Sequence, residues 1–198
     1  MLKEEIAPGI VVYSDVIPNS ENLYLEIEEG IISAGLEWSA AQVREPEGNT
    51  VNTKARDTST LGVTYYGKIS DDFSNFQSSF NSTLNNIFFE NFDPIENDYK
   101  QRFGFSTFSH EPYGILKYGL GQQFVEHVDD HQDFPRRMSY VYYLNDNYTG
   151  GEIVFPRFDI TFKPKANQMI VFPSNFMYRH SVSPVTEGER YAVVSWLN

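Results

Sequence analysis

Two histidines and one aspartate have the spacing of a metal-binding set. The first two members lie in the run Glu126-His127-Val128-Asp129-Asp130. On a β-strand, the side chains of residues i and i+2 point to the same face, so we expect His127 and Asp129 to reach into one cavity. His180 follows His127 by 53 residues in a second strand-like run and would supply a third ligand.

A metal held by two imidazoles and one carboxylate keeps half of its octahedral positions open. Non-haem Fe(II) oxygenases use this arrangement, because a bidentate cosubstrate and dioxygen need the open positions. A zinc hydrolase fits less well, since its usual helical pair of histidines with a neighbouring glutamate is absent from the sequence. The spacing therefore predicts a metal site formed by His127, Asp129 and His180, which suits Fe(II) and would also accept Mn or Co.

One arginine lies close to the third ligand in sequence. Arg190 follows His180 by ten residues, across the turn Thr186-Glu187-Gly188. Its planar guanidinium is always charged and can bind a carboxylate through two parallel hydrogen bonds. We therefore expect a short dicarboxylate cosubstrate, whose 2-oxo acid end chelates the metal and whose distal carboxylate meets Arg190.

The composition excludes several other kinds of site. The 198 residues include no cysteine, which rules out disulfides, thiolate catalysis, iron–sulfur clusters and cysteine zinc sites. The formal net charge of −12 disfavours binding to nucleic acid through a broad cationic face. Neither a signal peptide nor an apolar run of about 18 residues occurs, which predicts a soluble, cytoplasmic protein that does not enter a membrane.

The negative charge lies almost entirely in the first part of the chain. Residues 1–112 hold 7 Lys and Arg against 18 Asp and Glu, whereas residues 113–198 hold 8 against 9. We expect one domain, in which residues 1–112 form a supporting region of helices and strands and residues 113–198 form the catalytic core. The acidic first region favours a neutral or basic partner.

Two segments of the first region have helical periodicity. Residues 20–36 are expected to form a helix with Ser20 as its N-cap, Gly35 as its end, and Leu23, Ile27 and Ile31 on its apolar face. A second helix is expected from Ser70 or Asp71 to about Asn91, where Pro94 would end it. Its apolar face would carry Phe73, Phe76, Phe80, Leu84, Ile87 and Phe88. Residues 40–62, between the helices, are expected to form a long surface loop.

Short alternating runs replace this pattern from Tyr113 onward. Eight strand-like segments follow one another, cut by Gly, Pro and Asn-Asp clusters and without helices between them: GILKYGL, QFVEHVD, MSYVYYLN, GEIVFP, DITFKP, QMIVFP, YRHSVSPV and RYAVVSWL. This arrangement predicts a mostly β protein with a jelly-roll or small-barrel core. A further strand is expected over residues 10–16, and the helices are expected to pack on the outer face of one sheet.

Residues 113–198 carry a set of motifs with a joint spacing. They are the run from Tyr118 to Asp130, then Tyr142-Tyr143-Leu144-Asn145, Tyr148-Thr149-Gly150-Gly151-Glu152 and Phe155-Pro156, and then Pro164, Phe172, His180, Pro184-Val185, Gly188, Arg190 and Trp196. This set resembles the prolyl 4-hydroxylase branch of the 2-oxoglutarate and Fe(II)-dependent dioxygenases. The first 112 residues match only loosely, through a short helical entry and Arg56-Asp57-Thr58-Ser59.

The resemblance implies a double-stranded β-helix and a defined set of ligands. Iron would be held by His127, Asp129 and His180, and 2-oxoglutarate by Arg190 with hydrogen bonds from Tyr118 and Tyr143. Dioxygen would be the second cosubstrate and ascorbate a further cofactor. The implied reaction hydroxylates a C–H bond, most simply of a proline in a peptide or protein, while 2-oxoglutarate is converted to succinate and CO₂.

Several alternatives stay open at the level of sequence. The collagen-type members carry Lys at the position of Arg190, whereas oxygen-sensing and several bacterial members carry Arg, so this residue does not define the substrate. The same enzyme class would also fit another peptide residue, a free amino acid or another small molecule. A non-catalytic, cupin-like binding protein is a different class. In either class, Tyr118 and Tyr143 could be ordinary core aromatics, since the chain is rich in them. Gly150-Gly151 most simply makes a hairpin turn that needs positive φ.

Overall fold

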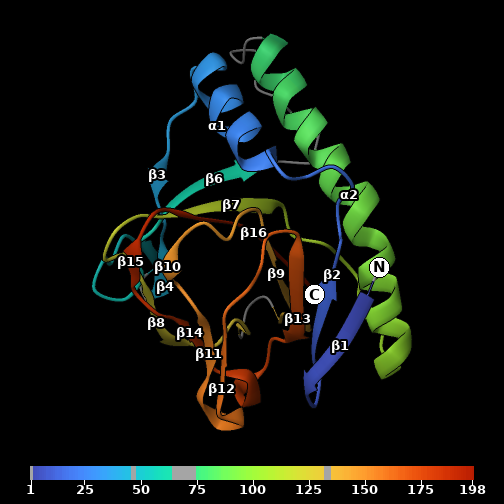
Figure 1. Ribbon diagram of the computed structural model, residues 1–198. Coiled ribbons are helices and arrows are strands. Elements are labelled where there is room, and N and C mark those ends of the chain that lie inside the picture. Colours follow the sequence, from blue (N-terminus) through green and yellow to red (C-terminus); the bar gives the residue numbers. More distant parts are fainter. Residues whose placement is uncertain (1, 46–47, 64–74, 132–134) are drawn as a thin grey trace.

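The computed structural model describes residues 2–45, 48–63, 75–131 and 135–198. Two α-helices, two short 3-10 helices and a series of strands make up these ranges (Figure 1). In chain order the elements are β1 (Leu2–Ala7), β2 (Ile10–Ser14), α1 (Leu23–Ser33), β3 (Ser39–Ala40), β4 (Val43–Glu45), β5 (Gly48–Thr50), β6 (Ser59–Val63), α2 (Asn75–Phe103), β7 (Tyr113–Tyr118), β8 (Phe124–His127), β9 (Met138–Tyr143), β10 (Thr149–Gly150), β11 (Ile153–Phe155), η1 (Pro156–Phe158), β12 (Ile160–Phe162), β13 (Gln168–Pro173), η2 (Phe176–Tyr178), β14 (His180–Val182), β15 (Val185–Glu187) and β16 (Arg190–Leu197).

Two antiparallel sheets form the body of the fold. The major sheet has eight strands in the order β1-β2-β13-β9-β16-β7-β6-β3, and the minor sheet has four in the order β12-β11-β14-β8. The prediction of a double-stranded β-helix with helices on one sheet is therefore confirmed, and each of the eight predicted segments after Tyr113 contains a strand. The strand expected over 10–16 is β2, whereas β1 was not predicted.

Both faces of the major sheet are buried, and consecutive residues of its strands alternate between two cores. On the outer face, Tyr142 and Val193 pack with side chains of α1 and α2. On the inner face, Tyr143, Ala192 and Val194 pack with apolar side chains of the minor sheet. Because successive residues point alternately into two apolar cores, the central strands read as nearly continuous apolar runs. The same alternation directs every second residue of β16, beginning with Arg190, toward the space between the sheets.

The first helix, α1, is shorter than its predicted range but buries the predicted face. Leu23, Ile27 and Ile31 are all buried. Asn22 rather than Ser20 is the N-cap, because Ser20 lies in a preceding turn whose carbonyl accepts from the Leu23 N–H. Gly35 adopts positive φ after the last turn, and the Leu36 N–H bonds back to the Ile31 carbonyl, which is a Schellman ending.

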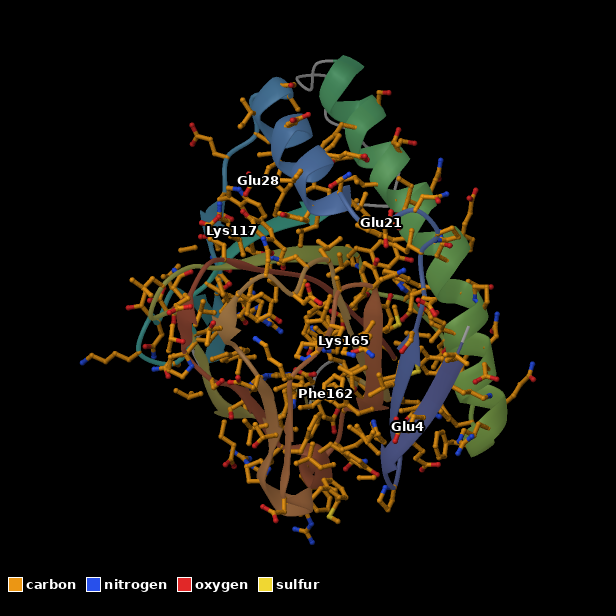
Figure 2. All side chains as sticks on the ribbon, in the orientation of Figure 1. Glu4, Glu21, Glu28, Lys117, Phe162 and Lys165 are labelled. Atoms are coloured by element: carbon orange, nitrogen blue, oxygen red, sulfur yellow. The ribbon has the colours of Figure 1, made fainter. Side chains whose placement is uncertain are left out.

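An ion pair ties α1 to the major sheet. Figure 2 labels Glu28 on the helix and Lys117 on β7, whose carboxylate and ammonium lie 2.8 Å apart. Both side chains are partly buried, so the pair adds a directional contact to the apolar packing of the helix.

The second helix, α2, continues past the residue expected to end it. Pro94 lies inside the helix, which runs to Phe103, so the predicted end near Asn91 is wrong. Packing beyond the proline explains the difference, because Ile95 and Tyr99 are buried in the outer core and the Tyr99 hydroxyl donates to the Gly9 carbonyl at 2.6 Å. The predicted start at Ser70 or Asp71, Phe73, and the side chain of Phe76 lie outside the described residues.

Residues 40–62 were expected to be a loop, and this is wrong for its last part. β6 pairs with β7 and extends the major sheet, while β4 and β5 form a small hairpin. Residues 46 and 47 lie outside the described residues. The division at residue 112 into a supporting region and a catalytic core stays a prediction, although the major sheet takes strands from both sides of it.

No helix within the described ranges is both long and apolar enough to cross a membrane.

An aromatic cluster around Phe92 lies in the outer core, so a substitution there tests how much this core stabilises the protein. The Phe92 ring contacts Phe88, Tyr113, Tyr140 and Tyr142, with ring centroids 5.1–5.8 Å apart. We expect Phe92→Ala to lower the free energy of unfolding by about 3–5 kcal/mol in urea denaturation, because it leaves a cavity between α2 and the major sheet.

The matched control is Phe176→Ala, whose ring is 71% exposed. Its cost should stay below about 1 kcal/mol. Equal effects of the two substitutions would contradict the assignment of Phe92 to the core.

Candidate metal centre

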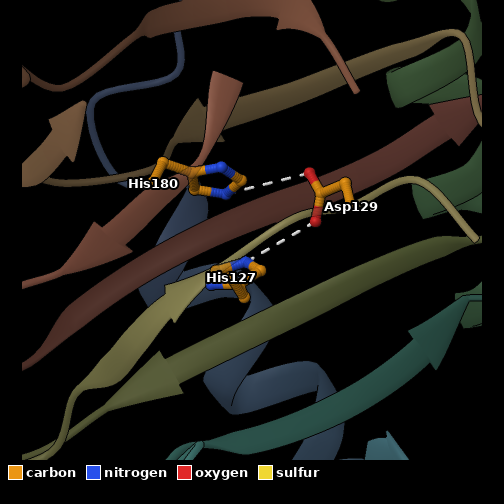
Figure 3. Close-up of side chains that lie close together, drawn as sticks. All are labelled: His127, Asp129 and His180. Atoms are coloured by element: carbon orange, nitrogen blue, oxygen red, sulfur yellow. Dashed lines mark ion pairs between the residues drawn. The ribbon is translucent and has the colours of Figure 1, made fainter. Parts of the chain in front are cut away.

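The two predicted histidine ligands lie opposite each other on neighbouring strands of the minor sheet. His127 ends β8 and His180 begins β14, and the two are register partners. Asp129 lies between their imidazoles, with its carboxylate oxygens 3.6 Å from His127 Nε2 and 3.8 Å from His180 Nε2 (Figure 3). One ligand atom from each of the three residues lies within 4.8 Å of the other two. A single ion can therefore contact all three.

The spacing of Asp129 from His127 predicts that both residues lie on one strand. In the structure, Asp129 instead reaches this position from a loop. β8 ends at His127, and residues 128–131 have no regular secondary structure. The loop is held from two sides: the Asp130 N–H donates to the Ser174 carbonyl at 3.0 Å, and Arg136 Nη1 donates to the Asp129 carbonyl at 3.3 Å. The two side chains meet as predicted, but the loop contacts position the carboxylate.

Backbone carbonyls orient both imidazoles. His127 Nδ1 lies 2.8 Å from the Val125 carbonyl, and His180 Nδ1 lies 3.1 Å from the Tyr178 carbonyl. A carbonyl can only accept, so each Nδ1 carries the hydrogen and each Nε2 keeps its lone pair for a metal. Phe124 stacks on the His127 ring at a centroid distance of 3.6 Å and fixes its plane.

The electrostatics keep the three groups ready to bind a cation. Burial, with His127 close by, lowers the pKa of His180 to about 4, so this imidazole is neutral at physiological pH. Burial opposes ionisation of Asp129, but the neighbouring His180 and His127 hold the pKa of its carboxyl below the ordinary range. The centre thus offers a carboxylate and a neutral imidazole without first losing a proton.

Arg190 lines the same cavity as the three candidate ligands. The cavity has a volume of about 990 Å³, and Tyr118, the register partner of Arg190, also lines it. Arg190 is only 1% exposed, yet its Nε and Nη1 atoms have no hydrogen-bond partner within the described part of the chain. An unpaired guanidinium in an apolar interior is costly, so its surroundings fit an anion that would supply the missing acceptors. The residues present therefore fit the predicted dicarboxylate.

Two tyrosines flank this guanidinium. Its carbon lies 4.8 Å from the centroid of the Tyr118 ring and 5.1 Å from that of the Tyr143 ring. The Tyr143 hydroxyl is buried and has no partner among the described residues. Burial raises the pKa of Tyr143, so its hydroxyl keeps its hydrogen and can donate to an anion. Both rings lie beside Arg190, and their predicted role toward the cosubstrate stays a proposal.

The turn Gly150-Gly151 has a second function besides reversing the chain. Both residues adopt positive φ, as expected. A Cβ atom added to Gly151 would lie 2.9 Å from Cδ of Arg190, which is closer than real Cβ atoms come to a neighbour. Glycine is therefore needed here to leave room for the arginine.

One group at the cavity was missed by the sequence predictions. Arg136 makes two bonds of 2.6 Å to the Glu111 carboxylate, and its guanidinium carbon lies 3.7 Å from the Trp196 ring centroid. All three residues line the cavity. Arg136 follows Asp129 by seven residues without any periodic pattern, so only its charge close to the ligand run could have drawn attention to it.

Removal of a ligand should abolish metal binding. We expect His180→Ala to weaken Mn(II) binding by at least about 100-fold in calorimetric titration, because the open site loses one of three protein ligands. His131→Ala is the control, since it removes a histidine from the loop next to the ligands and leaves the set intact. Equal losses in the two variants would contradict the assignment.

The Gly151 turn offers a test of the anion site that spares the metal ligands. Gly151→Ala should weaken binding of 2-oxoglutarate about 10-fold, because the new methyl group displaces Arg190, and should leave Mn(II) binding unchanged.

Gly62→Ala is its control, since an added Cβ there meets no atom within 4 Å. Unchanged 2-oxoglutarate binding in a folded Gly151→Ala protein would contradict the contact with Arg190. Folding is checked by the melting temperature of each variant.

Known proteins of the same fold cover nearly the whole chain. A prolyl-4-hydroxylase of Pseudomonas putida superposes with a TM-score of 0.65 at 19% identity, over 96% of this chain and 92% of that chain. A prolyl hydroxylase of Trichoplax adhaerens, solved in complex with a peptide fragment of the hypoxia inducible factor oxygen degradation domain, has a TM-score of 0.63 at 16% identity, over 96% and 83%. These likenesses show the fold.

Curated relatives match part of the chain. Human prolyl 3-hydroxylase 2 is 39% identical over 66 residues, which are 31% of this chain and 9% of the relative. A PKHD-type hydroxylase of Rippkaea orientalis is 37% identical over 90 residues, which are 41% of this chain and 40% of the relative. The matches thus span less than half of either relative.

A family model covers the region that holds the centre. It is described as the 2OG-Fe(II) oxygenase superfamily and matches residues 113–198. Together with the His-Asp-His set, it implies Fe(II) and 2-oxoglutarate as metal and cosubstrate. Residues 113–198 of this chain are therefore similar to the 2OG-Fe(II) oxygenase superfamily.

Proposed function

We propose that this protein is an Fe(II)- and 2-oxoglutarate-dependent dioxygenase that hydroxylates a proline residue of a peptide or protein. The observation that carries the proposal is one cavity lined both by the metal-binding set of His127, Asp129 and His180 and by Arg190, whose Nε and Nη1 have no partner among the described residues. A purely structural barrel gains nothing from burying these groups together.

Each of these residues has a distinct role in the proposed reaction. His127, Asp129 and His180 would hold Fe(II), while Arg190 would bind the distal carboxylate of 2-oxoglutarate with the help of Tyr143 and Tyr118. When bound, iron and 2-oxoglutarate would activate dioxygen: one of its oxygen atoms would be inserted into a C–H bond, and the other would enter the succinate that forms with CO₂ from 2-oxoglutarate.

Apolar side chains separate the two polar ends of the cavity. Leu116, Val141, Ile153, Val182 and Val194 line it between the sheets. Such walls exclude water, strengthen the electrostatic contacts of the bound anion and protect a reactive oxidant from side reactions.

The remaining wall suits a peptide with a proline. Trp196 lines the cavity beside Arg136, so its indole offers an apolar surface to a pyrrolidine ring. Gln42, Val43, Asn49, Ala55 and Arg56 bring the segment 40–62 to the same cavity. We propose that these five residues contact an extended substrate, which gives residues 1–112 a role at the rim and residues 113–198 the catalytic groups.

The names of the similar proteins support proline as the substrate residue. They differ in the ring carbon that is hydroxylated, so an experiment has to identify this carbon. The structural neighbour from Pseudomonas putida is named a prolyl-4-hydroxylase, whereas the human relative is named a prolyl 3-hydroxylase. Hydroxylation at C4 is the reaction we propose first, in line with the resemblance of residues 113–198.

The proposal is tested with proline-containing peptides. We expect purified protein with Fe(II), ascorbate and 2-oxoglutarate to add one oxygen atom to a proline-rich peptide, with one succinate formed for each hydroxylation. Mass spectrometry detects the added oxygen, and amino-acid analysis distinguishes 3- from 4-hydroxyproline.

Two controls separate the rival functions. The same peptide with alanine for proline, and free proline, should not be hydroxylated, and Asp129→Ala should be inactive with every substrate. Succinate formation without hydroxylation of any peptide would overturn the prolyl assignment and retain the enzyme class. Failure to bind 2-oxoglutarate would favour a non-catalytic binding protein.

A further inference from the structure

Four buried polar atoms that have no partner in the described part of the chain lie close to the Arg190 side chain in the inner core. They are Nε and Nη1 of Arg190 and the hydroxyl oxygens of Tyr143 and Tyr148. The sequence predictions assign a role to Arg190 and Tyr143 but none to Tyr148. Buried polar groups are nearly always hydrogen-bonded, so several unsatisfied groups in one place indicate a missing ligand.

Tyr148 is packed directly beside Arg190. Its ring lies next to Gly151 on one side of the turn, with Cε2 3.1 Å from the position of an added Cβ, and Arg190 Cδ lies 2.9 Å from the same position. The ammonium of Lys163 covers the ring at 3.7 Å from its centroid and also donates to the backbone carbonyls of Tyr148 and Gly150. These contacts hold the ring in place. Tyr148 is only 6% exposed, and its buried hydroxyl has no partner among the described residues.

The chemistry of this group favours a carboxylate. Arginine has donors only, and burial raises the pKa of both tyrosines, so their hydroxyls keep their hydrogens. The group therefore offers N–H and O–H donors from three side chains. A carboxylate can accept all of them, because its two oxygens provide about four lone-pair sites.

We propose that Tyr148 donates its hydroxyl hydrogen to the distal carboxylate of 2-oxoglutarate and completes a three-residue anion site with Arg190 and Tyr143. This inference rests on the proposed function for the identity of the anion. It assigns to Tyr148 a direct contact with the cosubstrate and makes the residue a determinant of cosubstrate choice, because the bond exists only for 2-oxo acids with a second carboxylate.

The test compares two ligands in two matched variants loaded with Mn(II). Tyr148→Phe removes the hydroxyl and keeps the ring under Lys163. Tyr142→Phe removes a hydroxyl from the outer face of the same sheet, where it donates to Asn167 Oδ1 at 3.1 Å. The ligands are 2-oxoglutarate and 2-oxobutyrate, which lacks the distal carboxylate. Calorimetry measures both dissociation constants.

We expect Tyr148→Phe to raise the dissociation constant of 2-oxoglutarate about 10-fold or more, because a hydrogen bond to a charged group is lost. Binding of 2-oxobutyrate should be unchanged, and Tyr142→Phe should change neither. Without ligand, Tyr148→Phe should melt no lower than the wild type, because the hydroxyl that it removes has no partner there.

Each failure has a separate meaning. If wild-type protein does not bind 2-oxoglutarate, the proposed function fails. If the wild type binds it and Tyr148→Phe binds it equally well, only the role of Tyr148 is overturned. Equal losses for 2-oxoglutarate and 2-oxobutyrate, or a lower melting temperature of the ligand-free variant, would also overturn it, since the hydroxyl would then support the structure of the pocket.

Discussion

The buried and permanently charged guanidinium of Arg190 is the feature on which the rest of the centre depends. Arg190 cannot lose its charge, and no described side chain accepts from its Nε or Nη1. Three features of the fold accommodate the guanidinium. Every second residue of β16, beginning with Arg190, points between the sheets, two tyrosine rings flank the guanidinium, and a glycine turn leaves room for the side chain. An anion in the cavity would supply the missing acceptors and offset the cost of the buried charge. The arginine therefore links the architecture of the two sheets to the choice of cosubstrate.

The metal-binding set depends on a different kind of constraint. Antiparallel pairing of β8 with β14 places His127 and His180 opposite each other, and backbone carbonyls select the tautomer that can bind a metal. Asp129 completes the set from a loop that Arg136 and Asp130 hold in place. Because the histidines belong to the minor sheet and Arg190 to the major sheet, the distance between metal and anion site is set by the apolar core between the sheets.

Much of this could be predicted from the sequence, because period-two patterning and ligand spacing are local signals. The eight strands after Tyr113 and the apolar face of α1 follow from alternation and helical spacing. The end of α2 could not be predicted from such local patterns, because tertiary packing of Ile95 and Tyr99 outweighs the local effect of Pro94. Tyr148 and Arg136 were missed for a related reason, since their roles arise from contacts between segments distant in sequence. Asp129 illustrates both cases, as its spacing predicted the meeting with His127 but not the loop that carries it.

The central claim is that Arg190 binds the cosubstrate and takes no part in holding the metal. Calorimetric titration of Mn(II)-loaded Arg190→Met with 2-oxoglutarate tests it most directly, because methionine keeps much of the side-chain volume and removes the charge. The account predicts a dissociation constant for 2-oxoglutarate at least about 50-fold higher than in the wild type, with Mn(II) affinity unchanged. An unchanged affinity for 2-oxoglutarate, or an equal loss of metal and cosubstrate binding, would contradict it.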